Sequence, residues 1–119
     1  MYHGQVVIEG RLTKEPKLSE VGEGKNVCRL SLASNRYYRN TEKELVNEVN
    51  YIDVDVWGNM AQICSDNLSK GRGVRVVGRL KHERWQDEEQ NYCDRHIIIA
   101  EHVEFFPDSA KKTAEEDQE

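Results

Sequence analysis

Hydrophobic and polar residues alternate with a period of two along most of the 119-residue chain. This alternation is typical of β-strands that have one buried face. Pro16 interrupts the first such segment, and the polar run Gln86–Asn91 separates the last two as a hairpin loop. The pattern predicts five strands, over residues 5–12, 25–34, 48–57, 73–85 and 92–105.

Each of the three middle strands has one aliphatic face, which we expect to line a common core. The predicted inward-facing residues are Cys28, Leu30, Leu32, Ile52, Val54, Val56, Val74, Val76, Gly78 and Leu80. Residues 35–47 are polar and show no periodicity, so we interpret them as a loop.

A single helix is predicted over residues 59–70, between the third and fourth strands. Met60, Ile63, Cys64 and Leu68 recur at i, i+3, i+4 and i+8, which is the spacing of one apolar helix face. Five strands with a short helix between strands 3 and 4 are the arrangement of the OB-fold, an all-β Greek-key barrel. Another α+β sheet remains an alternative on the pattern alone.

Charge divides the chain into two regions, residues 1–107 and residues 108–119. The net charge is −5, and the last twelve residues hold two Lys against five acidic residues, so they contribute −3 of it. We expect residues 1–107 to form one domain and residues 108–119 to form a short acidic disordered tail.

Several functional classes find no support in the sequence. The longest apolar run, Ile97–Ala100, is far shorter than the roughly 20 residues of a membrane span. The three cysteines and four histidines do not fall at metal-ligand spacings, and no nucleophile or phosphate-loop motif is present. We therefore expect a cytoplasmic protein with reduced thiols, no cofactor, no metal and no enzymatic activity.

Two basic stretches within the acidic chain indicate a polyanion as the partner. Residues 25–39 contain no acidic residue, and residues 70–84 contain only Glu83. Exposed aromatic residues between cations are what a single-stranded nucleic acid requires, because bases stack and phosphates need positive charge. The candidate stacking residues are Tyr38, Tyr51, Trp57 and Trp85, and the candidate phosphate contacts are Arg36, Arg39, Arg75, Arg79, Lys81 and Arg84.

The order and spacing of several short segments resemble the DNA-binding domain of bacterial single-stranded DNA-binding proteins over residues 4–105. The segments are Val-Ile-Glu-Gly-Arg-Leu (7–12), Arg-Leu-Ser-Leu-Ala-Ser (29–34), Asn-Tyr-Ile-Asp-Val-Asp-Val-Trp-Gly (50–58), Met-Ala-Gln-Ile-Cys (60–64) and Leu-Ser-Lys-Gly (68–71), followed by Arg-Trp (84–85). The resemblance implies a homotetramer that binds and protects single strands in replication, recombination and repair. It also matches Tyr38, Tyr51, Trp57 and Trp85 to the base-stacking aromatic residues of the family.

Three features depart from that family. Asp53 and Asp55 lie between two candidate stacking residues, and we expect Arg75 or Arg79 to neutralise them across the sheet. The Gly/Gln/Pro-rich linker typical of the family is missing, and the acidic tail has no Pro-Phe tip for docking replication and repair proteins. The chain therefore also resembles a short-tailed paralogue.

Two other functions remain open on the sequence alone. An OB-fold RNA-binding or primosome accessory module would have the same aromatic and basic residues. A structural OB-fold that pairs with another protein through a sheet edge would place the basic strip against an acidic partner.

Overall fold

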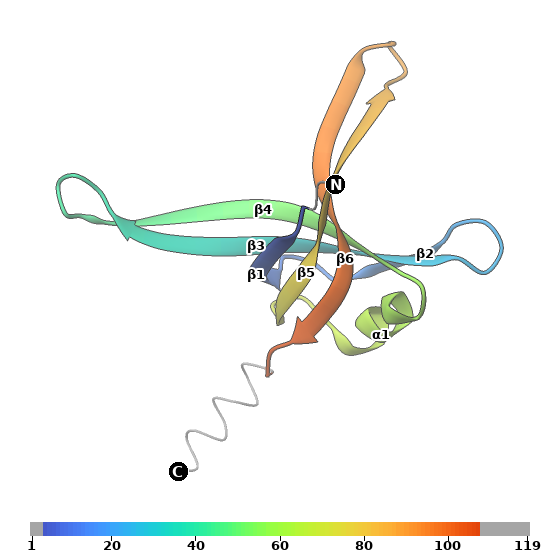
Figure 1. Ribbon diagram of the computed structural model, residues 1–119, viewed down its shortest axis with the longest axis horizontal. Coiled ribbons are helices and arrows are strands. Elements are labelled where there is room, and N and C mark those ends of the chain that lie inside the picture. The colour runs from blue at the N-terminus through green and yellow to red at the C-terminus, as the bar shows by residue number, and fades with distance from the viewer. Residues whose placement is uncertain (1–3, 108–119) are drawn as a thin grey trace.

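Strand pairing closes the chain into a barrel in the computed structural model, which describes residues 4–107 (Figure 1). The barrel strands of this region are β1 (Val6–Leu12), β3 (Asn26–Arg39), β4 (Leu45–Trp57), β5 (Gly73–Gln86) and β6 (Tyr92–Phe105). Their order is β1-β5-β6-β4-β3, and pairing of β1 with β3 at Arg11↔Ala33 and Leu12↔Leu32 completes the ring. β4 and β6 are parallel and the other pairs are antiparallel. This topology confirms the predicted OB-fold.

A short additional strand, β2 (Lys17–Glu20), pairs with residues 26–29 at the start of β3 and was not predicted from the sequence. Ser19 is its only partly buried residue. Because β2 buries no apolar face, it has no hydrophobic alternation by which it could be recognised.

The barrel interior is filled by the aliphatic faces that the alternation identified. Leu30, Val54 and Val76 are completely buried, and Val74 and Cys28 are buried with them. Leu80 was predicted to face inward but its side chain is 54% exposed. β5 continues beyond the barrel at this point, so no opposing strand within residues 4–107 covers Leu80.

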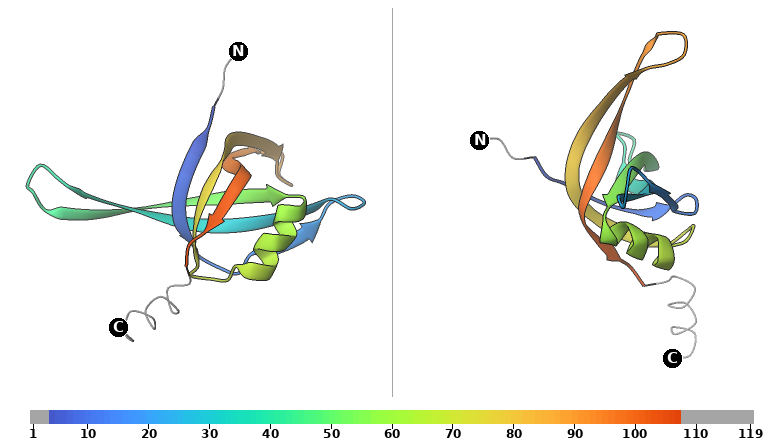
Figure 2. Two further views of the ribbon diagram at one scale, coloured as in Figure 1. Left: turned by 60° about the horizontal axis from the view of Figure 1, so that its bottom comes forward. Right: turned by 90° about the vertical axis from the view of Figure 1, so that its right-hand side faces the viewer.

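Helix α1 (Asn59–Asn67) packs against β2, β3 and β4 at one end of the barrel, as Figure 2 shows. It ends three residues before the predicted end, and Leu68 follows it in extended conformation. Ala61 and Cys64 are buried against the barrel, whereas Ile63, predicted on the apolar face, is exposed. No helix within residues 4–107 is long and apolar enough to cross a membrane.

Two long hairpins project from the barrel as arms, one formed by β3 and β4 and the other by β5 and β6 (Figures 1 and 2). The prediction of a loop over residues 35–47 was therefore wrong, because β3 and β4 pair without interruption up to Arg39↔Leu45. The turn is held by the Asn40 side chain, whose Oδ1 accepts the backbone N–H groups of Glu42 and Glu44. Both faces of this arm lie outside the barrel, so its strands carry no hydrophobic alternation.

Gly78 marks the bend at which β5 leaves the barrel. The register between β5 and β6 shifts at this point, from Val77↔His102 to Gly78↔Ala100. A Cβ atom on Gly78 would overlap the carbonyl group of Ile99. The close approach of the two backbones therefore requires glycine.

Candidate nucleic-acid interface

The outward face of β4 carries two aromatic rings with two carboxylates between them. Tyr51, Asp53, Asp55 and Trp57 alternate with the buried side of the strand. The side chains of Tyr51 and Trp57 are 74% and 44% exposed, although the residues between them are buried or partly buried. Neither ring contributes to the core cluster, so both are available to a ligand on this surface.

Arg29 neutralises Asp55 across the β3–β4 pair. Its Nε donates to Oδ1 of Asp55 at 2.7 Å, and its Nη2 donates to Oδ2 at 2.8 Å. The side chain of Asp55 is only 7% exposed. The hydrogen bonds to Asp55 raise the pKa of Arg29 above its ordinary value. This carboxylate is thus fixed within the sheet and presents little free negative charge.

Asp53 has different partners. Its Oδ1 accepts a hydrogen bond from the hydroxyl of Ser31 at 3.0 Å, and its Oδ2 lies 4.0 Å from Nη1 of Arg95 on β6. We expected Arg75 or Arg79 to neutralise the two aspartates, and this prediction was wrong. Asp55 pairs with Arg29 on β3, and Asp53 is nearest to Arg95, because β4 lies between β3 and β6 and does not pair with β5.

Arg95 connects the β4 surface with Trp85 on the β5–β6 arm. Its guanidinium lies 5.6 Å from the centroid of the Trp85 ring, and its Nη2 donates to Oε2 of Glu83 at 3.1 Å. A hollow of about 660 Å³ contains Trp85, Lys81 and Arg95 in its lining, and a second hollow of about 380 Å³ contains Tyr51 and Arg95. The two hollows share Arg95, so Trp85 and Tyr51 lie along one surface.

Arg79 and Lys81 share the outward face of β5 with Trp85, and Arg75 lies on the same face but far from that ring. Arg84 falls on the opposite strand face, although it also borders the hollow beside Trp85. Arg75 lies ten residues before Trp85, directly opposite Glu9 on one neighbouring strand and Glu104 on the other. Arg75 thus has an acidic residue at the paired position on each side, and about 33 Å of strand separates it from Trp85.

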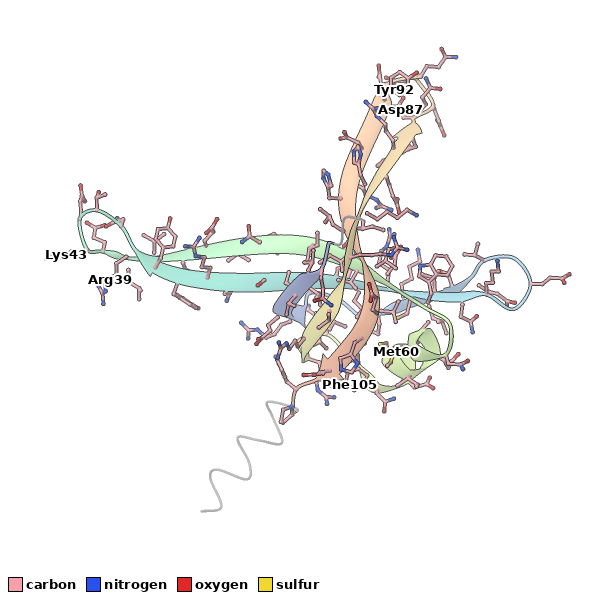
Figure 3. The ribbon with its side chains drawn as sticks, viewed as in Figure 1. Arg39, Lys43, Met60, Asp87, Tyr92 and Phe105 are labelled. Atoms are coloured by element: carbon pink, nitrogen blue, oxygen red, sulfur yellow. The ribbon has the colours of Figure 1, made fainter. Side chains whose placement is uncertain are left out.

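The remaining predicted residues lie on the β3–β4 arm, whose tip is marked by Arg39 and Lys43 in Figure 3. Tyr38 occupies the strand face opposite to that of Tyr51, and the guanidinium of Arg36 lies 5.4 Å from its ring centroid. Nη1 of Arg36 is 3.7 Å from Oε2 of Glu48, and Nη1 of Arg39 donates to the carbonyl of Lys43. The structure therefore places Tyr38 and Arg36 on the face opposite to the Tyr51–Trp57 face, whereas Arg39, at the end of the arm, is on the same strand face as Tyr51.

Sequence reasoning missed Arg29 and Arg95, the two cations in contact with the aspartates. Alternation with Cys28 and Leu30 places Arg29 on the outward face, but its pairing depends on the β3–β4 register, which places it opposite Asp55. The pairing of Arg95 with Glu83 was predictable from the hairpin loop. If the two strands pair from residues 86 and 92 towards the barrel, Arg95 falls opposite Glu83. Its approach to β4 depends on barrel closure.

The fold and this surface define a class of protein: an OB-fold barrel with exposed aromatic rings and cations on its outward strand faces. The sequence model of the "Single-strand binding protein family" matches residues 4–106. The chain belongs to this family.

Individual relatives and a solved structure agree with that assignment. The chain is 38% identical over 117 residues to a "Single-stranded DNA-binding protein" of Aquifex aeolicus, covering 97% of the chain and 79% of the relative. It is 33% identical over 102 residues to one of Helicobacter pylori, covering 86% of the chain and 57% of the relative. A structure described as "Plasmodium falciparum SSB complex with ssDNA" superposes with a TM-score of 0.81 at 25% identity, over 89% of this chain and 96% of that one.

Proposed function

We propose that the protein binds single-stranded DNA without reading its sequence, by stacking bases on aromatic rings and contacting phosphates with Arg and Lys. The observation that supports this most directly is the shared position of Arg95 between Trp85 and the Tyr51 hollow. Trp85 and Tyr51 each share a hollow with this cation, and Trp57 lies farther along the face of β4 that carries Tyr51. All three rings are exposed on outward strand faces, where a flexible strand can reach them.

The proposed contacts fall into two groups. The stacking residues are Tyr51, Trp57 and Trp85, with Tyr38 on the β3–β4 arm. Arg79, Lys81, Arg84, Arg36 and Arg39 supply positive charge near them, and Arg95 joins the two parts of the surface. Arg75, which the sequence placed among these cations, is a weaker candidate because Glu9 and Glu104 flank it.

In this proposal the protein acts by binding and not by catalysis. Its role is protection of single strands during replication, recombination and repair in the cytoplasm, associated with the nucleoid. The domain of residues 1–107 carries the binding surface. Residues 108–119, expected to be an acidic tail, lie outside the described residues.

A homotetramer is the proposed assembly, with a dimer as the simpler alternative. β1 pairs with β5 along Val6–Arg11 but meets β3 only at Arg11 and Leu12, so most of its other edge has no strand beside it in the described chain. Val7 on this strand is exposed. A second copy could pair with that edge, which removes an aggregation hazard. Light scattering at moderate salt tests this, and the mass of a single chain would contradict it.

Fluorescence titration tests the binding function. Stacking of bases on Trp57 and Trp85 should quench tryptophan fluorescence when poly-dT is added, and added salt should reverse the quenching. Trp85→Ala should weaken binding by about 1–3 kcal/mol, the range for one stacked base. An unchanged signal with poly-dT would contradict the proposal, and stronger binding to U oligomers would favour an RNA-binding module.

A further inference from the structure

Tyr37 and Tyr38 are consecutive residues of β3 and therefore project from opposite faces of the β3–β4 arm. The register runs without interruption from Ala33↔Tyr51 through Asn35↔Val49 and Tyr37↔Asn47. Directly paired residues of an antiparallel pair lie on the same face, and so does every second residue along each strand. Tyr37 is therefore on the face of Tyr51, and Tyr38 is on the other.

We propose that the arm contacts single-stranded DNA on both faces, with Tyr37 as an additional stacking residue on the face that continues from Tyr51. This inference rests on the proposed binding of single-stranded DNA. The ligand at Tyr37 is an unpaired base, and the adjacent phosphate lies near Arg39.

Exposure along this face supports the proposal. Tyr37 is 61% exposed, and its neighbours Leu45 and Val49 are also exposed. No barrel core lies beneath the arm, so these side chains are not buried by their own fold. Together with Asn35 and Asn47, which lie between them on the same face, they form a strip that runs along the arm from Tyr51.

Position and charge indicate DNA as the occupant of the strip. Tyr37 lies four residues along β3 from the position opposite Tyr51, which is about 13 Å of strand. The strip is continuous with the Tyr51–Trp57 surface, and Arg39 follows Tyr37 on the same face, opposite Leu45. The Tyr38 face differs, because the guanidinium of Arg36 already lies over the Tyr38 ring there. Arg36 also forms an ion pair with Glu48.

Photo-cross-linking of the full chain to a dT oligomer that carries 5-iododeoxyuridine tests the contact directly. Trypsin cuts after Arg36 and Arg39 and releases the tripeptide Tyr37-Tyr38-Arg39. Fragmentation of the cross-linked tripeptide in a mass spectrometer then distinguishes the two tyrosines. We expect cross-links on both Tyr37 and Tyr38. Cross-links on Tyr38 without any on Tyr37 would overturn the inference.

Affinity measurements on variants give an independent test. Tyr37→Ala should weaken binding to a long dT oligomer about 5- to 150-fold, which is the effect of losing one stacked base, and Tyr37→Phe should retain affinity. Asn40→Ala removes the side-chain hydrogen bonds that hold the arm's turn without removing a ring from the strip, and should have little effect. Equal losses in Asn40→Ala and Tyr37→Ala would show that the arm's stability, and not stacking, is responsible, which overturns the inference.

Trp85→Ala separates this inference from the proposed function. If Trp85→Ala weakens binding while Tyr37→Ala does not, Tyr37 is not a stacking residue and the binding function stands. If the unaltered protein does not bind the dT oligomer, the proposed function and this inference both fail.

Discussion

The guanidinium of Arg95 lies 5.6 Å from the ring centroid of Trp85, although the two residues come from different strands, β6 and β5. Glu83 holds the guanidinium in place through hydrogen bonds of 3.1 and 3.2 Å, and Asp53 of β4 lies 4.0 Å away. A single cation thus compensates two carboxylates beside an exposed indole. The proposed DNA surface depends on this compensation.

Replacing Arg95 should weaken DNA binding by more than the loss of one phosphate contact. Arg95→Ala leaves Glu83 and Asp53 without a compensating charge, so both repel phosphates. Titration of tryptophan fluorescence with poly-dT measures the loss. Arg95→Ala combined with Glu83→Gln should recover part of the affinity, and no recovery would show that the carboxylates are not the cause. Arg95→Lys, which keeps the charge, should be weakened less than Arg95→Ala.

The two aspartates of β4 should respond differently to neutralisation. Asp55→Asn breaks the bidentate pair with Arg29, so we expect a loss of about 1.5–3 kcal/mol in the free energy of unfolding. Asp53→Asn keeps an oxygen that can accept the Ser31 hydroxyl and removes negative charge from the surface, so DNA affinity should rise with little change in stability. Urea unfolding and poly-dT titration of both variants check this. Equal losses of stability would contradict the assignment of partners.

Salt dependence should separate the cations of β5. For single strands, log K falls with log[salt] with a slope of about −0.7 per neutralised phosphate. Arg79→Ala and Lys81→Ala should each flatten the slope by about that amount. Arg75→Ala should leave the slope unchanged, because Glu9 and Glu104 flank Arg75 away from Trp85. A flatter slope for Arg75→Ala would place DNA on the opposite end of the barrel.

Alkaline pH should destabilise the protein through its buried thiols. Burial raises the pKa of Cys64 to about 12 from an ordinary value of 9.0, and burial together with the charge of Asp55 raises that of Cys28. Between about pH 9 and pH 12 the unfolded chain loses the Cys64 proton while the native state keeps it. The native state then binds more protons, so the free energy of unfolding falls as pH rises, by up to about 1.4 kcal/mol per pH unit from this residue.

Urea unfolding under reducing conditions from pH 8 to pH 10 measures this dependence. In Cys64→Ala the free energy of unfolding should fall less steeply with pH than in the unaltered protein, whatever its value at pH 8. Cys93→Ala, at the half-buried third thiol, serves as the matched control and should keep the steep fall. If the free energy of unfolding of Cys64→Ala falls with pH as steeply as that of the unaltered protein, Cys64 does not cause the pH dependence.

Hydrophobic alternation by itself determined the barrel strands and most of the core, and the helical spacing of apolar residues determined the short helix. Leu30, Val54 and Val76 alternate with polar residues because each strand has one face in the core and one in solvent, and this is a local property of the chain. The outward position of Tyr51, Trp57 and Trp85 follows from the same alternation. Residues 35–39 and 45–47 were not recognised as strand residues, because both faces of an arm outside the barrel are exposed and no alternation results.

Only the tertiary structure decided which outward residues meet. Asp53 approaches Arg95, 42 positions away in the chain, because barrel closure places β4 beside β6. The pairing of Asp55 with Arg29 and the isolation of Arg75 between Glu9 and Glu104 likewise depend on strand register. Alternation specifies the face on which a side chain lies, but register and closure select its neighbours, since they arise from contacts between strands distant in sequence.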